Sequence, residues 1–297
     1  MRKQRKSVLS RIFDVFNIIL MMLICFICLA PIVHVVFASV SEPGQLALHT
    51  GIILKPLGFT TVGYRLIFNN SVILVSYLNT LFYLAAGLCI SMALTLLGGY
   101  VLSRKNLLWK NTIMFFITFT MFFSGGLIPF YIVVTKLGLY NTRWAVILPS
   151  AVSVFNLIIM RTSMQEIPES LEESAFIEGA GHLTILTKIM IPLSRATIAV
   201  IALFYAVSIW NSWFNASIFL TDRNKYPLQL VLKEILVAND SSQVIVSSTD
   251  TTGISTDIYK PLVKYCTIVV SILPVLCFYP FTQKYFIKGV MIGSIKG

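Results

Sequence analysis

Six long apolar runs alternate with polar segments along this 297-residue chain. A bilayer core takes roughly 20 apolar residues per helical span, and most of the runs reach that length. The fourth run is short, but it is uncharged between Arg143 and Arg161. The sequence therefore predicts an all-α, polytopic membrane protein with six transmembrane helices. We place these spans at about 12–38, 74–102, 111–134, 144–161, 196–220 and 262–281.

Composition supports the membrane assignment. Hydrophobic residues make up 57% of the chain, charged residues 12%, and the mean hydropathy is +0.83. A soluble domain usually carries about twice that share of charge. A chain with so little charge would expose large apolar patches to water, whereas lipid accepts such a surface.

The N-terminal segment, residues 1–11, is basic and precedes the first apolar run. That order is also found in secretory signal peptides, but the run at 12–38 is longer than a signal core and five more spans follow, so we expect a retained helix. Lysines and arginines are more frequent in the connections on the side of this segment, which the positive-inside rule assigns to the cytoplasm. With six spans, the C-terminal tail at 282–297 returns to the cytoplasm.

Several functions are excluded or disfavoured by what the sequence contains. The net charge of +11 comes from basic residues at helix ends on both sides, which is ordinary for a membrane protein and argues against nucleic-acid binding. The cysteines fall within predicted spans and lack metal-site spacing. No phosphate-binding loop of the G-x-x-x-x-G-K-[ST] type is present, so ATP hydrolysis by that route would need another chain.

An ion-coupled carrier or a channel remains an alternative. A carrier usually holds ionisable residues deep within its helices, whereas Asp14 and His34 lie near the two ends of the first span, where we expect them to cap or snorkel at the interface. We find no paired broken helices and no filter-like motif. A passive membrane subunit that takes energy from a partner fits best.

The long connection at 164–196 follows the fourth span and is rich in acidic residues. Pro168 and Ser170 predict the start of a short helix with acid in its first turn, which suits the helix dipole. Gly179 and Gly181 are expected to break it. A second helix is then expected from about Leu183 to Pro192.

This connection resembles the EAA loop of binding-protein-dependent ABC importer permeases. The resemblance is carried by Glu173, Ser174, Ala175, Gly179 and Pro192, with Leu193 following the proline. Departures from the family pattern are Ser174 for the middle alanine, Ile191 for a leucine and Ala196 for a second proline. The C-terminal sequence YPFTQKYFIKGVMIGSIKG resembles that of the carbohydrate-importer subgroup, such as the smaller maltose permease subunit, and internal segments resemble permeases for oligosaccharides from plant or algal polysaccharides.

The resemblance implies a type I ABC importer permease in the bacterial plasma membrane, with a core permease domain at 74–281. It also implies a heterodimer with a second, homologous permease, two ABC ATPase subunits that hold ATP and Mg, an extracellular sugar-binding lipoprotein and an oligosaccharide substrate. We expect no cofactor on this chain. The coupling contact with the ATPase is assigned to Glu173, Ser174, Ala175, Glu178, Gly179, Ala180, Gly181 and Pro192. A C-terminal contact with the ATPases is assigned to Gln283, Lys288, Gly289, Gly293 and Lys296.

Some acidic residues of the connection are instead interpreted as a solvated surface, namely Glu166, Glu169 and Glu172. In the tail, glycine recurs every fourth residue from Gly289, which favours an extended segment over a helix.

A sugar path is expected in the fifth span, where aromatic and amide side chains cluster. Aromatic faces cover the C–H side of a sugar ring, and amides satisfy its hydroxyl groups. The candidates are Tyr205, Trp210, Asn211, Trp213 and Asn215. The direction of the helix places Trp213 toward the outer interface, where an aromatic belt is expected in preference to a sugar contact. Asn79 and Asn156 are consistent with bonds between neighbouring helices. A permease for another solute, such as a polyamine or a phosphonate, remains the alternative within the same superfamily.

Overall fold

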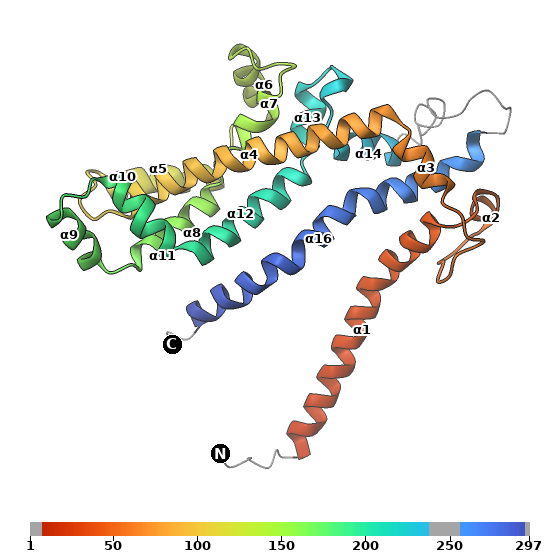
Figure 1. Cartoon of the computed structure of the whole chain (residues 1–297), viewed down its shortest axis with the longest axis horizontal. Helices are drawn as coiled ribbons and strands as arrows, with labels where there is room; N and C mark the ends of the chain where they lie inside the picture. The colour runs from red at the N-terminus through yellow and green to blue at the C-terminus, as the bar shows by residue number, and fades with distance from the viewer. Residues whose placement is uncertain (1–7, 238–255, 295–297) are drawn as a thin grey trace. The chain divides into compact units, whose positions relative to one another are not determined.

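The computed structural model describes residues 8–237 and 256–294. These residues form helices, turns and one isolated bridge between Ser41 and Phe59, and they contain no strand. The all-α prediction is therefore confirmed. The chain divides into two compact units, of which the first comprises residues 1–71 and 235–270 and the second residues 72–234 and 271–297. Figure 1 labels the helices of both.

The first unit contains the predicted first span and the start of the last one. Its helices are α1 (Val8–Ser39), α2 (Pro43–Leu48), α3 (Val62–Phe68), the 3-10 helix Thr256–Tyr259 and the first part of α16 (Lys260–Ser294). His34 Nδ1 accepts a hydrogen bond from the Ile53 N–H at 2.9 Å, and the Ser39 hydroxyl lies 2.7 Å from the hydroxyl of Tyr64. These hydrogen bonds hold the segment after α1 against the end of that helix.

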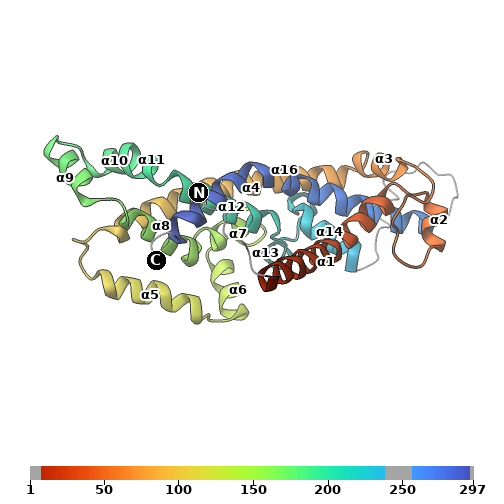
Figure 2. The ribbon, with the colours of Figure 1, turned by 90° about the horizontal axis from the view of Figure 1, so that it is seen from below.

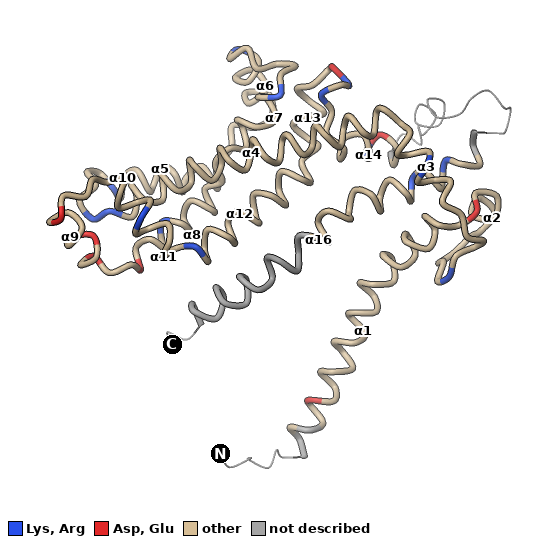
Figure 3. Tube along the Cα trace, viewed as in Figure 1, with Lys and Arg blue, Asp and Glu red and all other residues tan. Residues whose placement is uncertain are grey.

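The second unit contains the remaining helices. They are α4 (Ser71–Ser103), α5 (Lys110–Phe122), α6 (Leu127–Lys136), α7 (Trp144–Ile147), α8 (Val154–Gln165), α9 (Glu169–Ile177), α10 (His182–Ile185), α11 (Ile191–Leu193), α12 (Arg195–Trp210), α13 (Phe214–Phe219) and α14 (Leu228–Val237). Its charged residues gather near the two ends of α4 and α12 and leave the middle of these helices free of charge (Figure 3). This distribution is what a helix bundle in a bilayer requires.

A stripe of small residues on α4 allows close packing against other helices. Gly87, Ser91, Thr95 and Gly99 recur every fourth residue and are buried. A Cβ at Gly99 would lie only 2.7 Å from the Met160 side chain on α8, and one at Gly87 would lie 3.0 Å from Ile209 on α12. Small residues at this spacing let helix backbones approach each other in membranes.

The third and fourth predicted spans are bent pairs of helices rather than single helices, and another bent pair joins the end of the 164–196 connection to the fifth span. The described residues contain three continuous helices long and apolar enough to cross a membrane, and three further pairs that break sharply. α5 and α6 meet at 115° (Figure 2), α7 with its 3-10 extension meets α8 at 48°, and the 182–193 helix meets α12 at 85°. The sequence interpretation found no paired broken helices, because the two helices of each pair together are apolar enough to be taken for one span.

The third and fifth spans also differ from the continuous helices that the sequence predicts. Gly126 has a φ of +83°, a backbone conformation that glycine adopts without steric cost, and it turns the chain between α5 and α6. The predicted fifth span, 196–220, ends early because α12 stops at Trp210 and a separate helix begins at Phe214.

The segment after α13 is held against α4 and the α6–α7 connection by side chains. Asn79 Nδ2 donates to the carbonyls of Asn224 and Tyr226 at 2.6 and 3.2 Å, and its Oδ1 accepts from Arg143 at 3.0 Å. Tyr83 donates its hydroxyl proton to the Lys225 carbonyl at 2.7 Å. Asn79 was expected to join neighbouring helices, but it anchors a loop.

The C-terminal residues differ from their expected conformation. α16 continues as a helix to Ser294, so the extended tail expected from Lys288 is wrong over the described residues. The glycines at 289 and 293 cost helix stability relative to alanine but do not prevent a helix that has already formed from continuing.

Candidate functional site

A cavity of about 540 Å³ lies within the second unit, between α4, α7, α8, α12 and α13. Its lining combines aromatic rings with hydroxyl and amide groups and, among the described residues, includes no Asp, Glu, Lys or Arg. The polar lining residues are Ser91, Ser150, Ser153, Asn156, Ser208, Asn211, Ser212 and Asn215, and the aromatic ones are Tyr83, Phe155, Phe204, Tyr205, Trp213 and Phe214. Aromatic faces with neutral hydrogen-bonding groups suit a polyhydroxylated ligand.

Tyr205 is buried in the cavity wall and ties three helices together. Its hydroxyl accepts a hydrogen bond from the Ser153 N–H at 2.9 Å and lies 2.7 Å from the Thr95 hydroxyl. Ser153 is the N-cap residue of α8, and its side chain accepts from the Asn156 N–H. Tyr205 therefore links α12 to both α4 and the amino end of α8.

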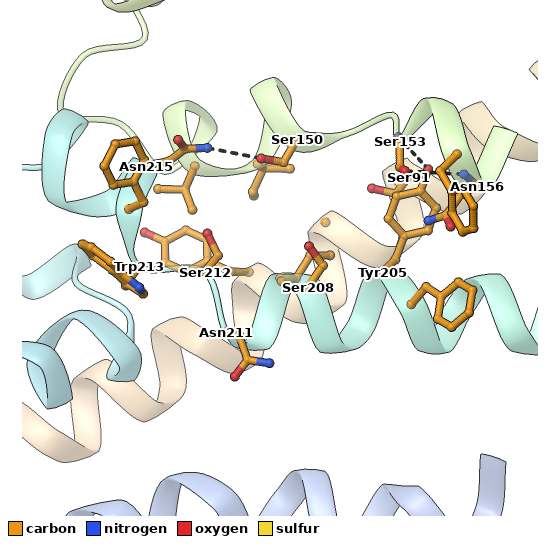
Figure 4. A pocket seen from close by; sticks show the side chains of 18 residues that line it. Ser91, Ser150, Ser153, Asn156, Tyr205, Ser208, Asn211, Ser212, Trp213 and Asn215 are labelled. Carbon is orange, nitrogen blue, oxygen red and sulfur yellow. Dashed lines mark hydrogen bonds between the residues drawn. The ribbon is translucent and has the colours of Figure 1, made fainter. Parts of the chain in front are cut away.

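The two amides and Trp213 lie around the break between α12 and α13 (Figure 4). Asn211 caps the end of α12 and Asn215 belongs to α13, so the expected shared helix face does not exist, yet both residues line the cavity. Asn215 Nδ2 donates to the Ser150 hydroxyl at 3.2 Å. Trp213 also lines the cavity, and the Lys233 ammonium lies 4.2 Å from its ring centroid.

Trp210 does not belong to the cavity lining. It is 4% exposed, its indole N–H donates to the Ser271 carbonyl at 3.1 Å, and its ring meets Tyr77 edge to face. The prediction of a substrate contact at Trp210 is not supported by this position. Trp210 and Asn211 are consecutive at the end of a helix, so their side chains point in different directions and meet different surroundings.

The acidic loop, residues 164–196, contains α9, α10 and α11. α9 begins after Pro168 as expected and ends in a glycine cap: the Gly179 N–H donates to the Phe176 carbonyl and the Ala180 N–H to the Ala175 carbonyl, both at 2.9 Å. This is the Schellman arrangement, and Gly179 has the left-handed φ of +82° that it requires. Gly181 has a φ of −78° and an extended ψ, so it precedes α10 without needing to be glycine.

α9 presents two different faces. Glu173, Ser174 and Glu178 are exposed, as a docking surface requires. Ala175 is only 8% exposed and packs into the core of the second unit, so its side chain is not available to a partner. Ile177, which the sequence interpretation did not select, is 88% exposed.

The remaining coupling candidates lie at the ends of the loop helices. Ala180 is half-buried against the same core, and Pro192 is exposed in α11, just before the 85° break at Ser194.

Glu172 is the functional residue that sequence reasoning misjudged. It is 8% exposed and forms an ion pair with Arg104, close to the end of α4. The Tyr100 hydroxyl lies 3.3 Å from Glu172 Oε1 and 2.9 Å from His182 Nδ1. Glu172 is therefore a buried anchor of α9 on α4, not a solvated acid. Its position three residues before the buried Ala175 is the signal that it shares the inner face of the helix.

Glu169 is a surface acid, in agreement with the prediction. Its carboxylate lies 2.6 Å from the Lys105 ammonium, and both side chains are well exposed. The hydrogen bond and the negative charge of Glu169 raise the pKa of Lys105. Exposed pairs of this kind add little to stability.

A single packed cluster runs from the acidic loop to the cavity wall. Its buried members include Ala175 of α9, Ile185 of α10, Tyr100 of α4 and Tyr205 of α12. Close-packed interiors transmit displacement because they have few voids to absorb it. A movement of α9 would therefore be transmitted through this cluster to Tyr205, which lines the cavity.

Four candidate tail residues, Gln283, Lys288, Gly289 and Gly293, lie in α16. Lys296 lies outside the described residues. Their assigned contact with ATPase subunits stays a prediction.

Comparison with known proteins identifies the family. Residues 94–291 match the family profile of the binding-protein-dependent transport system inner membrane component. The polygalacturonan/rhamnogalacturonan transport system permease protein YtcP of Bacillus subtilis is 41% identical over 97% of this chain and 99% of its own length. Protein LplC of the same organism is 37% identical over 97% of this chain and 96% of its own length.

A solved structure agrees with these sequence matches. The crystal structure of a bacterial ABC transporter involved in the import of the acidic polysaccharide alginate contains a chain that is 31% identical and superposes with a TM-score of 0.86. The match covers 96% of this chain and 100% of that one. The protein is therefore a membrane-spanning permease of ABC importers and belongs to the family of binding-protein-dependent transport system inner membrane components.

Proposed function

We propose that this chain forms half of the translocation pathway of an ATP-driven importer for oligosaccharides. The observation that carries the proposal is the packed cluster that joins α9 to Tyr205 in the cavity wall. It gives a mechanical route from a docking helix on one side of the second unit to a ligand-sized space within it. Membership of the importer family supplies the context.

The substrate is an oligosaccharide of the kind released from plant or algal polysaccharides. According to their names, one similar protein belongs to a transport system for polygalacturonan and rhamnogalacturonan, and another to an ABC transporter involved in the import of alginate. The neutral, partly aromatic lining of the cavity supports a sugar and offers no acidic group for a polyamine. Among the described residues, the lining also includes no Asp, Glu, Lys, Arg or His of the kind that an ion-coupled carrier would use.

The energy comes from two partner ATPase subunits that carry ATP and Mg, and a second, homologous permease completes the pathway. A sugar-binding lipoprotein delivers the substrate on the outer side. With both termini in the cytoplasm, the acidic loop faces the ATPases. α5 is apolar and has no buried residue, which is consistent with coverage by lipid or by the second permease.

The docking face for the ATPase consists of Leu171, Glu173, Ser174 and Ile177 on α9. Leu171 and Ile177 are exposed apolar side chains, 45% and 88%, on a polar loop, and Glu173 adds an unburied carboxylate beside them. A short helix with this mixture fits a groove that has an apolar floor and a basic rim. Ala175 and Glu172, on the opposite face, hold the helix in place.

Charge substitutions on this face test the docking assignment. Ile177→Asp and Glu173→Lys are each expected to weaken retention of the ATPase by about tenfold or more, because the first buries a charge and the second opposes a basic rim. The measurement is co-purification of the ATPase with the tagged permease. Glu166→Lys is the matched control, since Glu166 is exposed on the same loop but outside α9. Equal retention in all three variants would mean that the ATPase docks elsewhere.

A further inference from the structure

The amino end of α8 opens onto the cavity at the 48° break in the fourth span. Ser153, Phe155 and Asn156 all line the cavity there. The N–H groups of Ser153 and Asn156 are satisfied by the Tyr205 and Ser153 hydroxyls. The N–H groups of Val154 and Phe155 make no hydrogen bond within the described part of the chain. Free first-turn N–H groups and the positive end of the helix dipole favour an anion at this point.

Two buried polar side chains at the same end of the cavity have no partner of their own. Asn156 is 4% exposed and Ser91 is 1% exposed, and both line the cavity. Neither side chain makes a hydrogen bond to any residue that the structure describes. Figure 4 shows them with Ser153 and Tyr205, away from the break that carries Asn211 and Trp213. Ser91 is also one turn before Thr95, whose hydroxyl contacts Tyr205. Because the side-chain polar atoms of both residues face the open space of the cavity, a ligand there can complete their hydrogen bonding.

The charge distribution around the cavity does not oppose an anion. No carboxylate lines it among the described residues. The charge placed against its wall is positive, because the Lys233 ammonium covers the Trp213 ring. A negative group can therefore enter without meeting like charge.

We propose that the amino end of α8, together with Asn156 and Ser91, binds the carboxylate of a uronic acid unit in the transported oligosaccharide. The two free N–H groups, the Asn156 amide N–H and the Ser91 hydroxyl supply donors for the two carboxylate oxygens. This inference rests on the proposed function and assigns its substrate class to acidic oligosaccharides. Broken transmembrane helices commonly direct their positive ends at anionic substrates in this way.

The absence of a cationic side chain from the lining fits the task of a transporter. A site made of neutral donors and a helix dipole holds a carboxylate less tightly than an arginine fork would. A transported ligand must leave the site in every cycle, so weak binding is an advantage. A neutral sugar unit would leave the donors partly unsatisfied, which provides discrimination.

The test compares Asn156→Asp with Asn156→Leu in the complete importer reconstituted in proteoliposomes. The probe is radiolabelled trigalacturonate. An aspartate at the third position of α8 would itself occupy the positive end of the helix and repel the ligand, so we expect trigalacturonate uptake to fall about tenfold below that of the leucine variant. Asn69→Asp, the same change at an exposed residue far along the chain from the cavity, is expected to behave as the unaltered protein.

A second probe separates a charge effect from general damage. The trimethyl ester of trigalacturonate has the same size and hydroxyl groups but no charge, and Asn156→Asp is expected to reduce its uptake no more than Asn156→Leu does. Uptake of trigalacturonate by Asn156→Asp that equals or exceeds that of Asn156→Leu would overturn the carboxylate site and leave the sugar function standing. If the unaltered importer carries neither probe, the assignment of acidic oligosaccharides as the substrate class fails, and the carboxylate site fails with it, whereas the importer function is tested separately by other oligosaccharides.

Discussion

Glu172→Lys is expected to detach α9 from α4 and lower the stability of the second unit by about 3 kcal/mol, because it leaves Arg104 buried against a like charge. Tyr100 loses one of its two hydrogen-bond partners in the same step and keeps His182. The measurement is the thermal unfolding of the purified chain, together with limited proteolysis of the acidic loop. The loop should become the first site of cleavage.

Glu169→Lys is the matched control for this result. It makes the same change on the same helix, but the ion pair with Lys105 is exposed and should contribute no more than about 1 kcal/mol. The double variant Arg104→Glu with Glu172→Arg should recover part of the lost stability. Equal destabilisation by Glu172→Lys and Glu169→Lys would show that the buried pair does not anchor the helix.

Gly179→Val is expected to cost about 2 kcal/mol and to disorder the end of α9, because a β-branched residue is strained at a left-handed φ. No neighbouring atom lies within 4 Å of the added Cβ, so the penalty comes from the backbone alone. With the Schellman cap lost, Ile177 and Glu173 would no longer be held in position for docking. Thermal unfolding and ATPase co-purification should both report the change.

Gly181→Val separates backbone strain from the loss of a glycine. Gly181 also has open space around its Cβ position, but its backbone is extended, which valine tolerates well. The Gly181→Val variant should therefore keep its thermal stability and its docking to the ATPase. If Gly181→Val were as damaging as Gly179→Val, the helix cap would not be the reason that Gly179 matters.

The sequence predicted where the helices lie because long apolar runs have one stable arrangement in a bilayer. It did not predict where they break. The bend between α5 and α6 lies at a left-handed glycine, and the bend before α12 follows Pro192, yet each pair of helices is apolar enough overall to be taken for one span. The hydropathy of a segment reports whether the segment prefers lipid or water. It carries little information on where the helix axis changes direction.

The candidate sites were predicted unevenly for a related reason. Glu173 and Gly179 were selected by the resemblance to the EAA loop; the structure leaves Glu173 exposed and places Gly179 in the helix cap, and their contact with an ATPase stays a prediction. Glu172 was misjudged because its role depends on Arg104, 68 positions earlier in the chain. The cavity wall likewise draws on α4, whose stripe of small residues could have been found from its spacing of four.

ATP-dependent uptake by the reconstituted importer is the most direct test of the central claim, that this chain is the permease of an ATP-driven oligosaccharide importer. Proteoliposomes would contain this chain with its partner permease and ATPases, and binding protein and labelled trigalacturonate would be added outside. The account predicts uptake that requires ATP at the ATPase side and persists when ionophores collapse the proton and sodium gradients. Uptake that continues without ATP and stops when those gradients collapse would contradict the account and identify an ion-coupled carrier.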